Sequence, residues 1–186
     1  GQIWSHAEPA RSLGVSQPTI RRYLDLLTDV FLVRQLRPWH ENLVKRQVKS
    51  PKVYVRDSGL LHHLLGIRSQ ADLERHPKLG ASWEGFVVDA LLRELRPDEA
   101  YFWATHQGAE LDLMCIHGGR RYGFEIKRAD APTLTPSMRI ALADLKLDSL
   151  TVIYPGDRRY RLSDRVVVRP AGDLTALSWK TLRSDP

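Results

Sequence analysis

The sequence predicts a mixed α/β protein built from two modules, and two observations support this prediction. Helical and strand patterns follow one another in an order that differs between residues 1–66 and residues 80–186. The stretch 67–79 between them is polar and holds few large apolar residues, which is typical of a linker. We therefore expect a first module of helices and two strands, a linker, and a second module with a mixed sheet.

The composition is that of an ordinary globular protein of 186 residues, with 42% hydrophobic and 27% charged side chains. This excludes collagen, a coiled coil and wholesale disorder. A lone cysteine, Cys115, excludes an internal disulfide and a cysteine-based zinc site. No stretch approaches 18 apolar residues and no signal peptide is visible, so we expect a cytoplasmic protein without a membrane segment. Because the sequence starts at Gly1 without a Met, we expect a piece of a longer protein.

The positive charge is concentrated in the first module. Residues 1–66 hold 10 Lys/Arg and 5 Asp/Glu, a net of +5, whereas residues 67–186 hold 18 and 17, a net of +1. A basic module next to a nearly neutral one indicates where an acidic partner such as nucleic acid would bind. A solvated, arginine-rich surface without a partner is the alternative interpretation.

The first module begins with a helix-turn-helix pattern. Residues 7–13 predict a short helix that ends at Gly14. Ser16 is a favourable N-cap for the next helix, and Pro18 falls in its first turn, where the missing N–H costs little. Apolar residues then recur at helical spacing and give this helix one apolar face. They are Ile20, Tyr23, Leu24 and Leu27.

Two strand-like segments, 31–36 and 52–56, follow this pattern, and Asp57 can cap a short helix after them. A helix-turn-helix followed by two strands is the winged-helix arrangement, which often binds DNA. A packing role between domains is the alternative. The residues that we expect to contact DNA are Thr19, Arg21, Arg22, Lys45, Arg46 and Lys49.

The sequence of the second module predicts a helix, three strands, a helix and a strand, followed by a pair of short strands. An amphipathic helix runs from Gly80 and is ended by Pro97. Glycines at 118–119 predict a hairpin turn between the second and third strands. The expected strands are 101–105, 110–116, 122–127, 150–154, 159–162 and 166–168, with a helix over 138–147.

Charged residues interrupt the apolar pattern of these strands. Asp112 lies on one hairpin strand, and Glu125 and Lys127 lie two apart on the next, so that their side chains share a face. Paired carboxylates suit a hard divalent cation such as Mg²⁺, which could polarise a phosphodiester, and Lys127 could stabilise the charge that develops on the phosphate. An ion pair on a solvated edge strand is the alternative for an E-x-K motif.

The order of these elements resembles the restriction-endonuclease-like PD-(D/E)XK core. The resemblance implies that Asp112 and Glu125 bind Mg²⁺ or Mn²⁺, that Lys127 is the catalytic lysine, and that Glu84 is the acid of the preceding helix. The residues leading to Asp112 look like the G-x-E-x-D form of several such families, with Leu111 in place of the proline of the family name.

Eight short segments carry a second resemblance that covers nearly the whole chain: Leu13–Ser16, Thr19–Ile20, Tyr23–Leu27, Phe31–Val33, Pro51–Tyr54, Asp57–Leu60, Trp83–Phe86 and Glu125–Lys127. In this combination and order they resemble the C-terminal half of prokaryotic AAA-type ATP-binding proteins. The resemblance implies a winged helix and a nuclease-like domain of unknown function that follow an ATPase domain. The chain contains no G-x-x-x-x-G-K-[ST] loop, so we expect no ATP site in it.

Two functional hypotheses remain open from the sequence. The chain is either the DNA-binding and nuclease-like portion of an ATPase or a non-catalytic module that binds DNA or protein for that ATPase. The expected partners are DNA and the ATPase domain, without a membrane, and an oligomer is possible. Convergence of Asp112, Glu125 and Lys127 is the observation that favours the first hypothesis.

Overall fold

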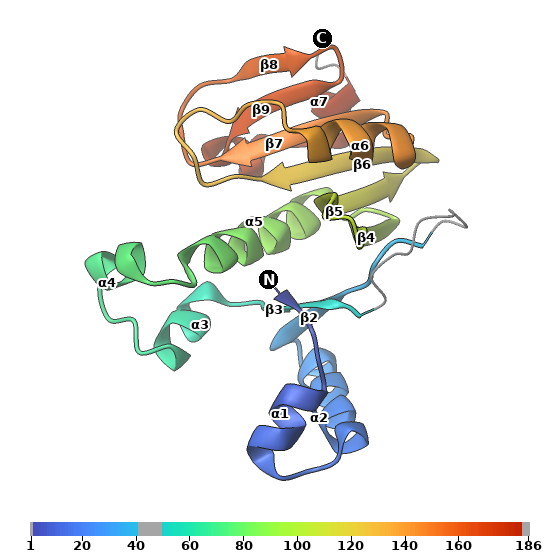
Figure 1. Cartoon of the computed structure of the whole chain (residues 1–186). Helices are drawn as coiled ribbons and strands as arrows, with labels where there is room; N and C mark the ends of the chain where they lie inside the picture. The colour runs from blue at the N-terminus through green and yellow to red at the C-terminus, as the bar shows by residue number, and fades with distance from the viewer. Residues whose placement is uncertain (1, 41–49, 184–186) are drawn as a thin grey trace. The chain divides into compact units, whose positions relative to one another are not determined.

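The computed structural model describes residues 2–40 and 50–183 (Figure 1). The described chain divides into two compact units. The first comprises residues 2–37 and 50–86, and the second comprises residues 38–40 and 87–183. Each unit is described by itself below.

The first unit begins with two helices and a small antiparallel sheet. Its sheet has the strand order β1-β3-β2, with β3 paired on both sides. Three further helical segments follow, the last being the start of α5. The elements are β1 (Gln2–Ile3), α1 (Ala7–Leu13), α2 (Gln17–Asp29), β2 (Val33–Leu36), β3 (Lys52–Val55), α3 (Ser58–Leu64), α4 (Gln70–Arg75) and α5 (Leu79–Leu95).

Local sequence signals place the ends of these helices as predicted. Gly14 follows α1 in a left-handed conformation with φ of 65°, which glycine adopts without steric cost. The Ser16 hydroxyl accepts a hydrogen bond from the backbone N–H of Thr19, and the Asp57 carboxylate accepts one from that of Leu60. The stretch 67–79, which we expected as a linker, contains the short helix α4, capped by Ser69.

The apolar face of α2 is only partly covered. Ile20 and Leu24 are each 4% exposed and face the interior of the first unit. Tyr23 and Leu27, which the helical spacing assigned to the same face, are 51% and 39% exposed. A helix of this amphipathic pattern therefore leaves a strip of apolar surface in contact with solvent.

The second unit is a six-stranded mixed sheet with helices packed on it. The strand order is β4-β5-β6-β7-β9-β8, in which β4, β5 and β6 are antiparallel neighbours and β6, β7 and β9 run parallel. The helix α6 packs on β5 and β7 (Figure 1). The elements are β4 (Glu99–Ala104), β5 (Glu110–His117), β6 (Arg120–Ile126), α6 (Pro136–Asp144), β7 (Ser149–Tyr154), β8 (Tyr160–Ser163), β9 (Val166–Pro170), a 3-10 helix η1 (Ala171–Ala176) and α7 (Trp179–Arg183).

One hydrophobic cluster of the second unit lies between α6 and one face of the sheet. Met138 and Ala141 of α6 and its C-cap residue Leu145 are fully buried in one cluster with strand residues such as Leu111 and Val152. None of the helices in the described ranges combines the length and apolar character that crossing a membrane requires.

The core is closely packed at Gly123 of β6. A Cβ atom at this position would lie 2.6 Å from Cδ1 of Leu147 and 3.3 Å from Cδ2 of Leu111. Both leucines are almost completely buried, so neither methyl group can move into solvent. The sequence at this point of β6 therefore requires the smallest residue.

The substitution Gly123→Ala should lower the free energy of unfolding by about 1–3 kcal/mol, because the added methyl overpacks a dense core. Urea unfolding followed by circular dichroism would measure this loss. Gly172→Ala is the matched control, since a Cβ at Gly172 meets nothing within 4 Å. Equal stability of the two variants would contradict the close packing at β6.

Candidate functional site

Asp112, Glu125 and Lys127 come together where the pairing of β5 with β6 ends. The regular ladder runs from the pair His117–Arg120 to the pair Leu113–Phe124. Beyond it, the carboxylate of Asp112 accepts a hydrogen bond from the backbone N–H of Ile126 at 2.9 Å, in place of a backbone carbonyl. Asp112 is 7% exposed. This bond fixes Asp112 directly opposite the strand segment that carries Glu125.

A β-bulge turns β5 at Asp112. Tyr101 of β4 pairs with Met114, but Trp103 pairs with Leu111, so two residues of β5 lie opposite the single residue Phe102. Leu111 and Met114 consequently both belong to the same buried cluster, although strict alternation would place them on opposite faces. Bulges of this kind reorient a side chain within a strand. Here the bulge contains the acidic residue itself.

Glu125 and Lys127 form an ion pair at the carboxyl end of β6. Oε1 of Glu125 lies 2.6 Å from Nζ of Lys127. The glutamate side chain is 2% exposed, whereas that of the lysine is 37% exposed and reaches solvent. The other carboxylate oxygen of Glu125, Oε2, is buried and has no hydrogen-bond partner among the described residues. A buried oxygen without a partner is costly unless another group or ion satisfies it.

The electrostatics of this pair are set by burial and by neighbouring carboxylates. Burial raises the pKa of Glu125 to about 7, the negative charges of Asp112 and Glu110 add to this rise, and Lys127 opposes it. Burial works against the charged form of Lys127, but the ion pair with Glu125 and the charges of Asp112 and Glu110 together outweigh it, and the pKa of Lys127 is raised. The site thus combines a carboxyl group that titrates near neutral pH with a firmly charged ammonium group.

Glu110 is a further acid of this site that was not among the predicted site residues. It begins β5, and the hydroxyl of Ser137 on α6 accepts from its backbone N–H and donates to its carbonyl oxygen, both at 2.7 Å. Its charge acts on both Glu125 and Lys127. Its place two residues before Asp112 in the G-x-E-x-D pattern was the sequence signal for it.

The donor set fits a small divalent cation. Among the described residues, no group of three or more His, Cys, Asp or Glu side chains is placed to hold a metal ion. Mg²⁺, however, is commonly bound by only one or two carboxylates, with water and substrate oxygens completing its shell. Asp112 and Glu125 provide these two carboxylates, and the unpartnered Oε2 of Glu125 is the oxygen that a cation would satisfy.

Glu84, the fourth predicted site residue, contacts Lys52 and Tyr54 of β3 in the first unit. Its Oε1 accepts from Nζ of Lys52 at 2.9 Å and from the hydroxyl of Tyr54 at 2.7 Å. Burial acts to raise the pKa of Glu84, but the positive charge of Lys52 and the hydrogen bonds from Tyr54 and Lys52 act against it, and the pKa lies below its ordinary range. A role for Glu84 in catalysis stays a prediction.

The residues predicted to bind DNA are partly described. Arg21 and Arg22 are exposed on α2, and Thr19 is half-buried with its hydroxyl 2.9 Å from that of Ser16. Lys45, Arg46 and Lys49 lie outside the described residues.

A large exposed apolar group follows these arginines at the end of α2. Phe31 is 73% exposed and has a φ of 60°, a conformation that is uncommon for a bulky residue. Leu26 and Val30 beside it are 59% and 52% exposed. Exposed apolar residues that are close in the chain indicate a surface for a partner more than isolated ones do.

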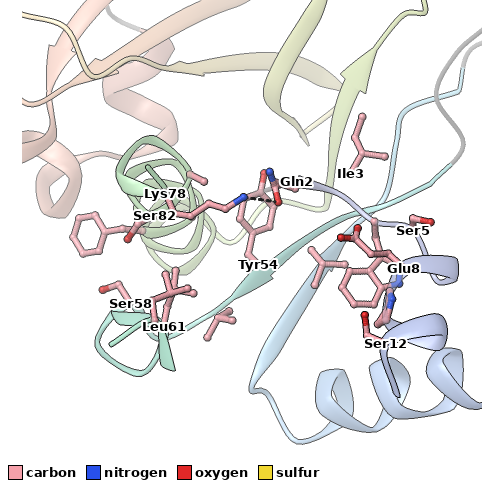
Figure 2. A pocket seen from close by; sticks show the side chains of 18 of the residues that line it. Gln2, Ile3, Ser5, Glu8, Ser12, Tyr54, Ser58, Leu61, Lys78 and Ser82 are labelled. Atoms are coloured by element: carbon pink, nitrogen blue, oxygen red, sulfur yellow. Dashed lines mark hydrogen bonds between the residues drawn. The ribbon is translucent and has the colours of Figure 1, made fainter. Parts of the chain in front are cut away.

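A cavity of about 560 Å³ is a second apolar feature of the first unit (Figure 2). It is lined by α1, β1, β3, α3 and the first turns of α5. Lys78 reaches across one end and donates to the side-chain oxygen of Gln2 at 3.1 Å. Thr19, Arg21 and Arg22 do not line it. No sequence motif marks this cavity, because its lining comes from five separate segments.

Comparison with known proteins assigns the chain to a family. Residues 79–174, which include Asp112, Glu125 and Lys127, match the model of a domain of unknown function (DUF4143). The chain belongs to the DUF4143 family. Residues 1–71 of this DUF4143 protein match a second domain of unknown function (DUF8612). No solved structure matches it.

Two curated relatives of the DUF4143 protein are the uncharacterized protein Rv2008c of Mycobacterium tuberculosis and the uncharacterized protein Mb2031c of Mycobacterium bovis. Each is 58% identical to it over 174 residues, which is 94% of this chain but 40% of the relative. The chain therefore spans about two fifths of the length of these relatives.

The raised pKa of Glu125 predicts a specific pH dependence of stability. The folded chain binds more protons than the unfolded chain between the ordinary glutamate pKa of 4.5 and about 7. The free energy of unfolding therefore falls as the pH rises through this window. Glu125→Gln removes the titration, so the stability of this variant relative to the wild type should increase from pH 4.5 to 7 and level off above.

Urea unfolding at several pH values between 4 and 8.5 would measure this difference. Glu74→Gln is the matched control, since Glu74 is exposed on α4. If the free energies of unfolding of the wild type and Glu125→Gln changed in parallel with pH, the charged form of Glu125 would not be destabilised by its surroundings.

Proposed function

We propose that this chain is the DNA-binding, nuclease-like portion of a longer AAA-type ATPase and that it hydrolyses phosphodiesters with Mg²⁺ or Mn²⁺. The observation that carries the proposal is the buried, unpartnered oxygen of Glu125 next to Asp112 and the Lys127 ammonium group. In this proposal the second unit is a PD-(D/E)XK core and the first unit is a winged helix.

The arrangement of elements supports these two finer fold assignments. In the second unit the order α5-β4-β5-β6-α6-β7 agrees with the nuclease-like pattern, and the acids lie on β5 and β6 as that pattern requires. In the first unit α1 and α2 are followed by β2 and β3, which pair antiparallel, and the short β1 before α1 adds a third strand to this sheet.

Each residue of the site has a distinct chemical task. Asp112 and Glu125 would hold the cation, which supplies polarisation of the phosphodiester and a more acidic water. Lys127 lies at the solvent side of Glu125, where its ammonium group can stabilise negative charge on a phosphate oxygen. Glu125 keeps Lys127 charged through their ion pair, and Asp112 keeps β5 and β6 in register at the site.

Cleavage of labelled DNA is the direct test of this proposal. The wild type should cleave single- or double-stranded DNA in Mg²⁺ or Mn²⁺, and EDTA should abolish the cleavage. Asp112→Asn, Glu125→Gln and Lys127→Met should each lower the rate by about 100-fold or more, because each removes a cation ligand or a charge-stabilising group. Asp164→Asn, an exposed acid in the turn before β9, is the control and should cleave normally. Metal-dependent cleavage at the same rate in all variants would contradict the proposal.

A non-catalytic binding or assembly function is the second candidate. It is favoured by the exposed apolar residues at the end of α2 and by the apolar cavity of the first unit. Such surfaces are more typical of contact with protein than with the phosphate backbone of DNA.

A DNA-binding assay on variants of α2 distinguishes DNA binding from an assembly function of the first unit. Arg21→Ala with Arg22→Ala should weaken DNA binding and reduce the slope of log K against log salt by about one for each phosphate that is no longer neutralised. Fluorescence anisotropy at several salt concentrations would measure both effects. Arg68→Ala with Arg75→Ala changes the charge equally at exposed positions and is the control. Unchanged affinity in the α2 variant would favour the assembly function.

A further inference from the structure

The carboxyl ends of β6 and β7 lie side by side at the candidate site. The two strands are parallel neighbours, and the backbone N–H of Lys127 donates to the carbonyl of Ile153 at 2.9 Å. Strand β7 ends at Tyr154, so the loop 155–159 leaves the sheet next to Lys127. Figure 1 shows both arrowheads at the same edge of the second unit, with the loops that follow them beside each other.

The loop 155–159 is held in one conformation by Tyr154. The hydroxyl of this tyrosine, which is 2% exposed, donates to the carbonyl of Arg158 at 2.7 Å and accepts from its N–H at 2.8 Å. A Cβ atom at Gly156 would lie 2.2 Å and 2.6 Å from atoms of the tyrosine ring. The loop therefore wraps closely around the ring, and its arginine side chains are presented from a fixed backbone.

Tyr160 connects the loop after β6 to Tyr154. Its hydroxyl donates to the carbonyl of Pro132 at 2.9 Å, and its ring contacts that of Tyr154 edge-to-face at 6.2 Å between centroids. The segment between β6 and α6, which begins with Lys127 and Arg128, is thereby connected to the loop after β7. Two loops from adjacent strands are thus organised by one pair of tyrosines.

These loops carry a group of arginines at the rim of the site. Arg128, Arg158 and Arg159 are exposed. Burial, and after it the positive charge of the nearby Arg159, lower the pKa of Arg169 on β9. The exposed Asp130 and Asp157 offset part of this charge. The two loops nevertheless carry three exposed arginines at the edge of the sheet where β6 and β7 end, which is also the edge of Lys127.

We infer that Arg158 and Arg159, presented by the tyrosine-held loop, bind the backbone phosphates of a nucleic acid next to the candidate site. The inference rests on the proposed function, because it names how the substrate of that site would be held. Guanidinium groups bind phosphate oxygens in a bidentate manner, and a fixed loop loses little conformational freedom on binding. The nearly neutral net charge of the second unit conceals this local arrangement.

Binding without cleavage tests the inference. The full chain is titrated in EDTA against a fluorescein-labelled duplex and a labelled single strand, and anisotropy is read at several salt concentrations. Arg158→Ala with Arg159→Ala should raise Kd about 10-fold and lower the salt slope by about two, because two phosphates are no longer neutralised. Arg93→Ala with Arg120→Ala removes the same charge from exposed positions of the second unit and should bind as the wild type does.

Two further variants separate a phosphate contact from a general loss of charge or structure. Arg158→Lys with Arg159→Lys keeps the charge but not the bidentate geometry and should recover part of the affinity. Tyr154→Phe keeps every charge but frees the loop, so it should weaken binding while thermal unfolding shows a folded chain.

The outcomes are distinct from those of the cleavage test. If the wild type does not cleave DNA but binds it, and Arg158→Ala/Arg159→Ala weakens this binding, the phosphate contact is supported and catalysis is rejected. Equal losses in this variant and in Arg93→Ala/Arg120→Ala would overturn the inference, as would the absence of any DNA binding. Preferential displacement of DNA by polyglutamate would also overturn it and identify an acidic peptide as the ligand.

Discussion

The hydrogen bond from the Ile126 N–H to the carboxylate of Asp112 is the interaction on which the candidate site depends. It takes the place of a backbone pair at the point where the ladder of β5 and β6 ends, and it is possible because the bulge adds one residue to β5. Without it, a buried amide would be left without a partner and Asp112 would have no fixed position. The acidic residue is thus a structural part of the sheet as well as a candidate ligand.

The two units of the chain contain different kinds of functional feature. In the second unit charge is buried: Glu125 is held without solvent, next to another carboxylate and a lysine. In the first unit apolar groups are exposed, at Phe31 above all, while its buried charges, Lys52 and Glu84, satisfy each other. Buried charge near a strand end is typical of chemistry, and exposed apolar surface is typical of contact with a partner.

The features that the sequence predicted well are local ones. The caps at Ser16 and Asp57 and the order of the elements follow from neighbouring residues, and Glu125 and Lys127 share a face because they are two apart on a strand. The bulge at Asp112 could not be predicted, because the extra residue appears only through the pairing of β5 with β4. Helical spacing likewise identified Tyr23 and Leu27 as an apolar face without showing whether anything covers it. In the loop after β7, the need for glycine at position 156 appears only in the structure, where the ring of Tyr154 leaves no room for a Cβ atom.

The two hydrogen bonds of the Ser137 hydroxyl have a consequence for the motions of the second unit. Because the amide of Glu110 donates to a side chain of α6, it can exchange its hydrogen with solvent only when that contact opens. The beginning of β5 and the first turn of α6 therefore share one opening event. Local unfolding of a single helical turn would release the Glu110 backbone and alter the electrostatic surroundings of Glu125 at the same moment.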